Sequence, residues 1–590
     1  MPRNRWITLL HQLSASATNY AAECIQETQQ FPLRMRHYIV DSVNFYRIRP
    51  VQLKDEILNG ISTAAMQIPE SIAFAFIANI SPSRGLYSTF FIGLFGGLFT
   101  SLPGMVSGIA GGMVAVLSDL TSDNGPLAHL CLSERVEYAF AAMMMCGVIQ
   151  LLLGITHLTK FIRLVSHSVM AGFANGLSII IFMAQLKAFQ IPMENAKSPA
   201  SQQSCPPLDY VPPASERWLR LDELQTWLVI IIVMISMAIM LLQTRIPGEL
   251  RLFRLRISSR VIPPTLTAMV ISTLVGNLLY NALGQRIRLI GDIARFSGTL
   301  PVSHIPQIPW TDGATWGIIL QHGVLLALVG TIESLLTWQL GQKITKTNVS
   351  IDLSTWEATS QGIGNVFSSF FSSVGGSVMI GQTVANFNNG SRGRISTTVA
   401  AFGVLLVVTV AGPVIELMPI AALTGIMFVV VLRTFEWKTF QYIYRLSIPI
   451  TDIICIILVT VLAVMTNLAI AVLVGVCWSS LVFAAKSIRY THVKALPAHT
   501  FQISGPVFFG SFDRLHRYFS EQKLPQTTFI DLSQAILCDS SSIDFLKSIQ
   551  TMLAREGKEL VLVGADQCLV NRSRKLAKAN ADEIIEMHAM

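Results

Sequence analysis

IPESIAFAFIA at residues 68–78 and TIESLLTWQLG at residues 331–341 repeat one pattern. Each stretch places an acid followed by serine inside an apolar helix, with Glu70 as the acid in the first copy and Glu333 in the second. An ionisable side chain within a membrane-spanning helix is costly, so both acids are candidates for a functional role. The recurrence of this arrangement predicts that the chain contains an internal repeat.

A second recurrence follows the first in the same order. The stretches SGIAGGMVA at 107–115 and SVMIGQTVA at 377–385 both read Ser-x-x-x-Gly-x-x-Val-Ala, and the second copy of each pattern follows the first by 263 to 270 residues. The first acid lies in the first apolar segment and the second acid in the eighth, so the two segments start on opposite sides of a membrane. These features predict an inverted repeat.

Composition places the chain among membrane proteins. The 590 residues are 52% hydrophobic and 13% charged, whereas a soluble domain carries about 25% charged residues. The net charge of +8 resides largely in short basic loops beside apolar runs, as membrane topology requires. We therefore expect membrane lipid, and no nucleic acid, among its partners.

The apolar runs and the helix breakers between them predict fourteen membrane segments. Their approximate bounds are 59–80, 86–101, 105–119, 136–157, 165–188, 225–243, 262–282, 316–340, 358–374, 378–390, 396–412, 415–433, 450–466 and 467–486. A straight spanning helix needs ~20 residues, and the segments that begin near 105 and 378 are short and rich in glycine.

Basic residues alternate between the two sides of the predicted membrane. They are frequent at 160–163, 245–260 and 392–394, and sparser per unit length in the loops 191–223 and 284–315. The positive-inside rule then predicts a multi-pass protein of the cell membrane, an inner membrane where there are two, with both termini in the cytoplasm.

Three regions are expected along the chain. Residues 1–50 form a polar, amphipathic cytoplasmic region without a signal-peptide pattern, and residues 51–487 form the membrane domain. Residues 488–590 have the alternating strands and amphipathic helices of a soluble α/β domain, which ends in a helix and tail from residue 566.

The two glycine-rich stretches are poor continuous helices, because glycine weakens helix and permits unusual backbone. We predict that each enters as a short extended piece and turns into a half-helix, near Gly111 and near Gly381. Two half-helix N-termini that meet at the membrane midplane would offer free amides and positive dipole ends to an anion. In the alternative interpretation, these glycines only permit close helix packing.

A bare carboxylate beside an anion site would repel the anion. The conflict disappears if Glu333 is protonated, or neutralised by a cation, when the anion binds. Burial and a nearby negative charge both favour the protonated acid, so proton and anion would assist each other's binding, which is the thermodynamic basis of symport. Glu70 could share this role. The alternative for either acid is a structural hydrogen bond between helices.

Three other polar residues were considered for this site. Thr337 lies one turn after Glu333 on the same face; it could contact a coupling ion, and a helix-packing hydroxyl explains it equally well. Gln382 and Thr383 begin the second half-helix and could reach the substrate.

The sequence shows no motif that is typical of an enzyme active site. The eight cysteines form no CxxC pair, so neither a zinc site nor a redox motif is indicated. We find no pairing of nucleophile and base, no metal cluster and no phosphate-binding loop. We therefore expect no enzymatic activity, no metal and no cofactor.

The motifs together resemble the SulP (solute carrier 26) family of anion transporters. The resemblance is carried by IPESIAFAFIANISPSRGLYSTF (68–90), IGQTVANFNNGSRGRIS (380–396) and FIDLSQAILCDSSSIDFL (529–546). It implies seven plus seven inverted segments, a C-terminal STAS domain and a homodimer. It also implies a core domain, at about 51–157 and 316–412, that moves against a gate domain, at about 165–282 and 415–487.

The resemblance also implies roles for single residues. The acid of segment eight matches Glu333, with Thr337 one turn later, and a glutamate here is similar to members that couple transport to protons. The positions that contact substrate in the family match Glu70, Phe74, Ala110, Gly111, Met379, Ile380 and Gly381.

This sequence departs from the family at the second half-helix. Many members have Ser or Thr near Met379 and Ile380, and Arg at the position of Gln382. The apolar and neutral residues here leave the backbone amides as the main expected anion ligands, with Gln382 beside them.

The C-terminal domain is similar to anti-sigma-factor antagonists, in which a serine of a comparable turn is phosphorylated. Here the turn is Asp539-Ser540-Ser541-Ser542; its simpler interpretation is the N-cap of the following helix. The resemblance leaves open a cytoplasmic protein partner for this domain.

We expect a secondary active anion transporter that works by alternating access, with H⁺ favoured over Na⁺ as the coupling ion. Sulfate is the first substrate to test, with bicarbonate and dicarboxylates also open. The alternatives are an anion exchanger or channel, and a membrane-anchored STAS signalling protein.

Overall fold

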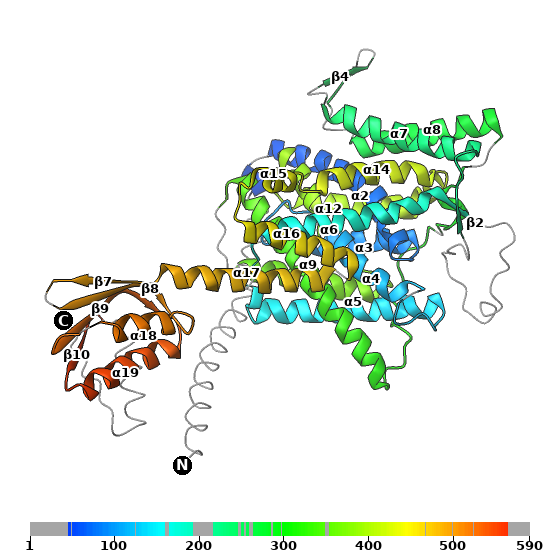
Figure 1. Cartoon of the computed structure of the whole chain (residues 1–590). Helices are drawn as coiled ribbons and strands as arrows, with labels where there is room; N and C mark the ends of the chain where they lie inside the picture. Colours follow the sequence, from blue (N-terminus) through cyan, green and yellow to red (C-terminus); the bar gives the residue numbers. More distant parts are fainter. Residues whose placement is uncertain are drawn as a thin grey trace. The chain divides into compact units, whose positions relative to one another are not determined.

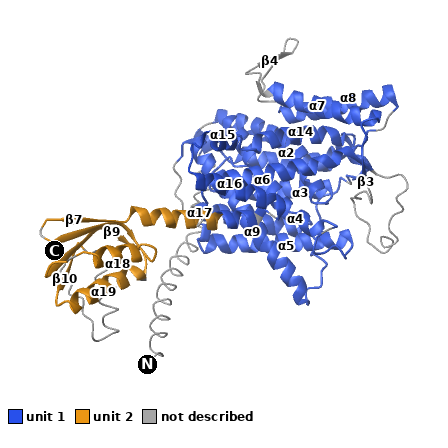
Figure 2. Ribbon diagram, in the orientation of Figure 1, with its two compact units in different colours: residues 1–475 blue, residues 476–590 orange. Residues whose placement is uncertain are grey.

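The structure, a computed structural model, describes residues 45–564 apart from short gaps. These gaps are 49, 124, 160–164, 193–215, 246–248, 253–254, 259–262, 285–286, 297, 348–352, 467, 498 and 523. The predictions for residues 1–44, for the basic loop 160–163 and for a helix after residue 566 lie outside the described residues. The chain forms two compact units, residues 1–475 and 476–590 (Figure 2).

The first unit contains most of the predicted membrane segments, and we call it the membrane unit. Its first half follows the predicted order of segments (Figure 1). Its elements are α2 (Pro50–Ile77), α3 (Pro82–Phe99), β1 (Ser107–Gly108), α4 (Gly111–Thr121), α5 (Leu132–Ile155), α6 (His167–Gln185), η2 (Leu186–Phe189), α7 (Leu224–Arg245) and α8 (Pro264–Leu283). Helix boundaries have local causes: Pro82 and Pro264 occupy first helical positions, where a missing N–H costs nothing, and Gly284 ends α8 with a left-handed backbone.

The second half repeats this order. Its elements are α9 (Gly313–Thr345), α10 (Leu353–Phe370), β6 (Ser377–Val378), α11 (Ile380–Asn388), α12 (Ile395–Val410), α13 (Gly412–Glu416), α14 (Ile420–Thr434), α15 (Lys438–Arg445), α16 (Ile450–Met465) and α17 (Leu468–Tyr490). Asp312 caps α9 by accepting a hydrogen bond from the Ala314 amide. Each of the fourteen predicted segments therefore contains a described helix, which confirms the predicted fold.

Helix length distinguishes two classes of segment. Within the described residues, seven helical stretches are long and apolar enough to cross a membrane: α5, α6 with η2, α7, α8, α9, α14 with α15, and α17. The helices α4, α12 and α16 are shorter but also apolar. The short α4 belongs to one of the two glycine-rich segments for which interrupted helices were predicted.

Both glycine-rich segments consist of a two-residue strand followed by a half-helix, as predicted. The strands β1 and β6 pair antiparallel, with Ser107 opposite Val378 and Gly108 opposite Ser377. The ladder continues at one end, where the Met379 amide donates to the carbonyl of Val106. The two half-helices therefore start from one shared, two-stranded element.

Helix packing separates the membrane unit into two groups. In one group α2 packs on α3 and α12, α5 packs on α9 and α10, and α4 and α11 pack on α9. In the other group α6 packs on α14 and α16, and α7 packs on α8 and α14. We call the first the core group and the second the gate group. Helix α2 contacts α14 and α8 across the boundary.

The structure adds elements that the hydrophobic pattern did not predict. Two hairpins connect gate helices, β2 (Gln190–Pro192) with β3 (Glu216–Trp218) and β4 (Glu249–Leu252) with β5 (Leu255–Ser258). The strands of each hairpin are only three or four residues long, too short for periodicity to identify. The short helix α15 was missed for the same reason.

The second unit contains a mixed four-stranded sheet in the order β10-β9-β8-β7. Its elements are β7 (His492–Leu496), β8 (Thr500–Val507), α18 (Phe512–Ser520), β9 (Thr527–Leu537), α19 (Ser540–Arg555) and β10 (Glu559–Val563). Strand β9 pairs parallel with both β8 and β10. The core is formed by side chains of the sheet and both helices, including Ile503, Ile530, Phe519 and Phe545, as expected for a STAS-like α/β domain.

Candidate functional site

Glu333 lies where the two half-helices meet. Its side chain is 5% exposed. Its Oε1 accepts a hydrogen bond from the amide of Gly112, in the first turn of α4, at 3.1 Å. Its Oε2 accepts one from the hydroxyl of Ser377, in β6, at 2.7 Å. The acid predicted from sequence therefore touches the start of one half-helix and the strand before the other.

Glu70 makes the corresponding contact from the first repeat to the second. The side-chain amide of Gln382, in the first turn of α11, donates to Glu70 Oε2, and both side chains are buried. Gln382 follows Gly112 by the offset of the glycine-rich motifs, so the two contacts are equivalent by the repeat. In each contact the acid of one repeat reaches the first turn of the half-helix of the other.

Arg433 also interacts with this acid. It lies in the last turn of α14, in the gate group, and it interacts electrostatically with Glu70. A core acid and a gate cation therefore attract each other near the second half-helix.

Thr337 is fully buried on the face of α9 that carries Glu333. Its hydroxyl donates to the carbonyl of Glu333 at 2.8 Å and to that of Val378 at 3.4 Å. Ser334, on the same helix, accepts from the Val378 amide at 3.2 Å. The serine and threonine thus attach β6 to α9, in line with the helix-packing interpretation of Thr337.

The first strand is held by polar side chains of α2 and α3. Gln67 donates to the carbonyl of Ser107 at 2.9 Å, and the hydroxyl of Thr89 accepts from the Ile109 amide at 3.3 Å. Ser71 bonds to Thr89 at 2.6 Å. These contacts satisfy backbone groups that a continuous helix would have satisfied itself, as membrane depth requires.

Several amides at the two half-helix starts remain available. Ala110 and Met379 are the residues before the first helical positions. Among the described residues, no protein acceptor takes the amides of Gly111 and Met113 in α4, or those of Ile380, Gly381 and Gln382 in α11. A helix N-terminus with free N–H groups attracts negative charge, so the site can bind an anion without a basic side chain.

The second half-helix start faces open space. Ile380 is 42% exposed, and a Cβ added to Gly381 would meet no atom within 4 Å. The start of the first half-helix is covered instead: a Cβ at Gly111 would lie 3.1 Å from Phe74 and 3.2 Å from Ile181. Phe74 belongs to the core and Ile181 to the gate, so the two groups close over Gly111.

Two residues that contact Glu333 were not predicted from the sequence. Gly112 was passed over in favour of Gly111, yet a Cβ at Gly112 would collide with Glu333 Oε1. Ser377 was quoted in the motif without a role. The recurrence of serine four residues before each motif glycine could have identified it, because a hydroxyl can donate to, or accept from, a carboxyl group.

The serine turn of the second unit supports the capping interpretation. Asp539 caps α19 and accepts from the Ser542 amide at 3.2 Å. Ser542 is fully buried, and its hydroxyl donates to the carbonyl of Val507 at 2.6 Å. Its hydroxyl therefore serves the fold, and phosphorylation of this turn stays untested.

Comparison with known proteins identifies the families to which both parts of the chain are similar. The sequence profile of the sulfate permease family matches residues 53–459, and that of the STAS domain matches residues 490–589. The chain belongs to the sulfate permease family. The family consists of transporters, in agreement with the expectation that the chain is not an enzyme.

Relatives within this family differ in the anion they are named for. YbaR of Bacillus subtilis (strain 168), named for sulfate transport, is 30% identical over 89% of this chain and 97% of its own length. The bicarbonate transporter BicA of Picosynechococcus sp. is 27% identical over 74% of this chain and 70% of its own length. The family is thereby established, and the substrate is not.

Solved structures share the fold. The anion transporter Slc26a9 of mouse, in an inward-facing state, covers 88% of this chain and 87% of its own, with a TM-score of 0.70 and 17% identity. The transmembrane domain of a cyanobacterial BicA covers 72% of this chain and 97% of its own, with a TM-score of 0.55 and 23% identity.

Proposed function

We propose that this protein is a secondary active transporter that carries a small anion together with a proton by alternating access. The observation that carries the proposal is the pair of hydrogen bonds from Gly112 and Ser377 to Glu333. An ionised Glu333 occupies the positive end of α4 and adds negative charge beside the amides that an anion needs. A protonated Glu333 removes that charge.

The geometry permits protonation without loss of contacts. A protonated carboxyl group can donate through one oxygen and still accept through the other. Glu333 Oε2 can donate to the Ser377 hydroxyl, while Oε1 continues to accept from Gly112. The proton therefore changes the charge of the site and leaves its shape intact, so proton and anion favour each other's binding.

Glu70 offers a second proton site with a different partner. Its partners are the side-chain amide nitrogen of Gln382, which can only donate to it, and Arg433 of the gate group, with which it interacts electrostatically. We therefore assign proton coupling to Glu333 and a positioning role at the second half-helix to Glu70. The remaining substrate positions, among them Phe74, Met379 and Gly381, stay part of the proposal.

The orientation of the protein has independent support. Cys131, in the connection between α4 and α5, is disulfide-bonded, whereas Cys146, Cys455, Cys477 and Cys538 are free. Disulfides persist in oxidising compartments and are rare in the cytosol. Helix α4 would then end outside the cell, which leaves both chain termini in the cytoplasm after fourteen crossings.

The substrate is the least specified part of the proposal. Sulfate is the first candidate and bicarbonate the second, since relatives are named for each; dicarboxylates come next. Homodimerisation and a protein partner of the STAS domain remain predictions from the family resemblance, and mass photometry of the detergent-solubilised protein tests the first.

The test is uptake into proteoliposomes. Radiolabelled sulfate, bicarbonate and succinate are offered with an acidic outside and with equal pH on both sides. Symport predicts accumulation of at least one anion that requires the pH gradient. Equal flux without the gradient would favour an exchanger or channel, and no flux of any anion would favour a signalling role.

A further inference from the structure

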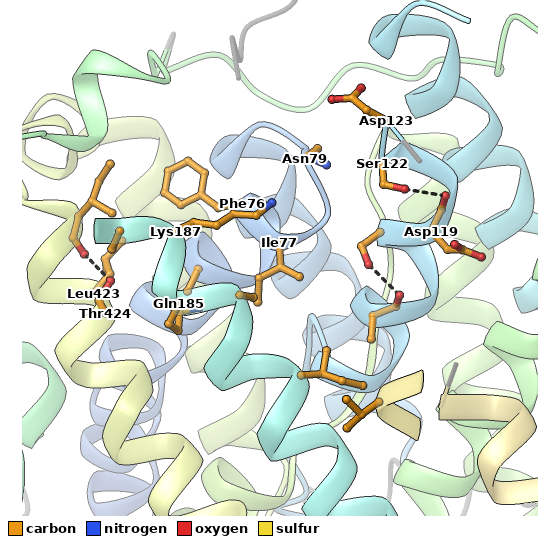
Figure 3. Close-up of a pocket in the computed structure, with 18 of the residues that line it drawn as sticks. Phe76, Ile77, Asn79, Asp119, Ser122, Asp123, Gln185, Lys187, Leu423 and Thr424 are labelled. Atoms are coloured by element: carbon orange, nitrogen blue, oxygen red, sulfur yellow. Dashed lines mark hydrogen bonds between the residues drawn. The ribbon is translucent and has the colours of Figure 1, made fainter. Parts of the chain in front are cut away.

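A pocket of about 610 Å³ lies between the core and gate groups, on the side of the membrane at which α2 ends (Figure 3). We call this the far side. The end of α2 and the second half of α4 form one wall, and α6, α14 and α16 contribute to the other. The α4 wall begins at Ala115, one turn after the first residue of the half-helix, so the pocket starts next to the candidate anion site.

The pocket is closed toward that site by apolar side chains. Phe74 and Ile181 cover Gly111, and Ile180 and Ala73, their chain neighbours, line the pocket. A solute in the pocket is therefore separated from the half-helix amides by one layer of side chains, from a core helix and a gate helix. Relative movement of these two helices would open the layer.

The two acids of the pocket already have partners. Asp119 lies 3.6 Å from the imidazole of His322, and Asp123 forms a 2.8 Å ion pair with Arg135. Both partners belong to the core group, on α9 and α5. These contacts draw the acids toward their own wall and offset part of their charge.

The bases of the pocket lie on the gate side. Arg288 donates to the carbonyl of Gln190 at 3.4 Å. Lys187 is exposed, and within the described part of the chain its ammonium group has no hydrogen bond or ion pair. Figure 3 shows its side chain reaching from η2, which directly follows α6, into the space between Leu423 and Asp119.

We propose that this pocket is a capture site for small inorganic anions, with Lys187 as its cation. This proposal rests on the transport function proposed above and assigns the far-side entrance of the anion path. A lysine ammonium is a compact point charge with flexible reach. It can concentrate anions of different shapes in a cleft without holding them tightly. Selection would then occur at the half-helix amides.

The charge of the pocket can be measured without transport. Ser122, which lines the pocket beside Asp119, is changed to cysteine in the full-length protein, and the exposed Cys477 and Cys538 are changed to serine. The labelling rates of a negatively charged and a positively charged methanethiosulfonate are compared in proteoliposomes. The same protein with Ser122 intact gives the background rate.

Lys187→Gln should lower the ratio of the anionic to the cationic labelling rate, on the order of fivefold at low salt, and high salt should remove most of the difference. Lys187→Arg should retain the ratio. Lys343→Gln, in the last turn of α9 on the opposite side of the membrane, is the matched control and should leave it unchanged. A ratio that Lys187→Gln does not alter would overturn the proposal.

Transport supplies the second readout. For whichever of radiolabelled sulfate or bicarbonate the wild type accumulates, Lys187→Gln should raise KM by a similar factor and leave kcat unchanged, because capture precedes the transport step. An unchanged KM would also overturn the proposal. If the wild type transports neither anion, the proposed function fails, and the labelling ratio still decides whether the pocket attracts anions.

Discussion

Glu333 of the second repeat accepts a hydrogen bond from the main-chain amide of Gly112 in the first repeat. The equivalent contact joins Glu70 of the first repeat to Gln382 of the second. The contacts are related by the repeat but differ in chemistry: Gly112 offers a main-chain amide, and Gln382 offers a side chain. On this difference we base the proposed division of roles, with proton coupling at Glu333 and positioning at Glu70.

Replacing Glu333 by Gln should abolish accumulation driven by a pH gradient. The amide cannot take up or release a proton, but it keeps the size of the side chain and can still accept from Gly112. Exchange of internal for external anion should therefore persist. Accumulation and exchange are measured in the same proteoliposomes with radiolabelled sulfate and bicarbonate.

Glu416→Gln is the control for this substitution. Glu416 accepts from the Phe296 amide at 2.7 Å, away from both half-helices, so this variant should accumulate anion like the wild type. Wild-type accumulation by Glu333→Gln itself would remove Glu333 from the coupling mechanism.

Replacing Gly381 by Val should abolish anion binding with little effect on folding. A Cβ here meets open space, so the added side chain projects toward the free amides instead of into the packed core. Binding is measured by the thermal shift that sulfate or bicarbonate induces in the purified protein. Gly317→Val, at a position in α9 that also has open space, should retain the shift, and unchanged affinity in Gly381→Val would support the packing interpretation of the glycine.

Replacing Gly112 by Ala should disturb Glu333 directly. The new Cβ would collide with Glu333 Oε1 and lie 3.0 Å from Val329, and such overpacking costs about 1–3 kcal/mol. We expect a lower Tm together with loss of proton-driven accumulation. Gly381→Ala adds the same methyl group where there is room and should leave Tm unchanged. Equal Tm values for the two variants would show that Gly112 is not tightly packed.

The stability of the second unit should depend on pH through the carboxyl group of Asp531. Partial burial alone would raise the pKa of this carboxyl, but hydrogen bonds from Ser533 at 2.9 Å and Gln502 at 2.8 Å outweigh it and lower the pKa. A carboxyl with a lowered pKa stabilises the fold at pH values above its ordinary pKa, and this contribution is lost as pH falls through the folded-state value.

Asp531→Asn should therefore lower the unfolding temperature of the second unit at pH 7, and the difference from wild type should shrink toward pH 3. Thermal scans of the full chain in detergent at both pH values measure this. Asp544→Asn, on α19 of the same unit, removes one acid without the hydrogen bonds described for Asp531. A difference that grows as pH falls would contradict the assignment.

Sequence alone predicted the fold and pointed to the two acids of the candidate site, because membrane burial imposes strong patterns. The order of the fourteen segments follows from apolar length, and the interrupted segments follow from glycine in a helix that must satisfy its own backbone. Glu333 and Glu70 were found because acids are rare in lipid. Gly112 and Ser377 were not, because their importance lies in contacts between segments more than 40 residues apart.

The pocket residues show a second limit of prediction from sequence. Lys187 and Asp119 come from different segments, and nothing in their local sequence says that one would be paired and the other would project into a shared space. His322, the partner of Asp119, is 3% exposed, and its local sequence does not show that it pairs with another segment. Pairing of this kind depends on how helices pack, which hydrophobic periodicity does not specify.

The two-residue ladder between β1 and β6 constrains how cargo can leave. Ser107 and Gly108 pair with Val378 and Ser377, and all four residues are buried. The N-termini of the two half-helices therefore cannot separate without breaking buried main-chain hydrogen bonds. In the alternating-access cycle that we propose, the two half-helix starts would therefore move as one body, and the neighbouring helices would expose the site first on one side of the membrane and then on the other.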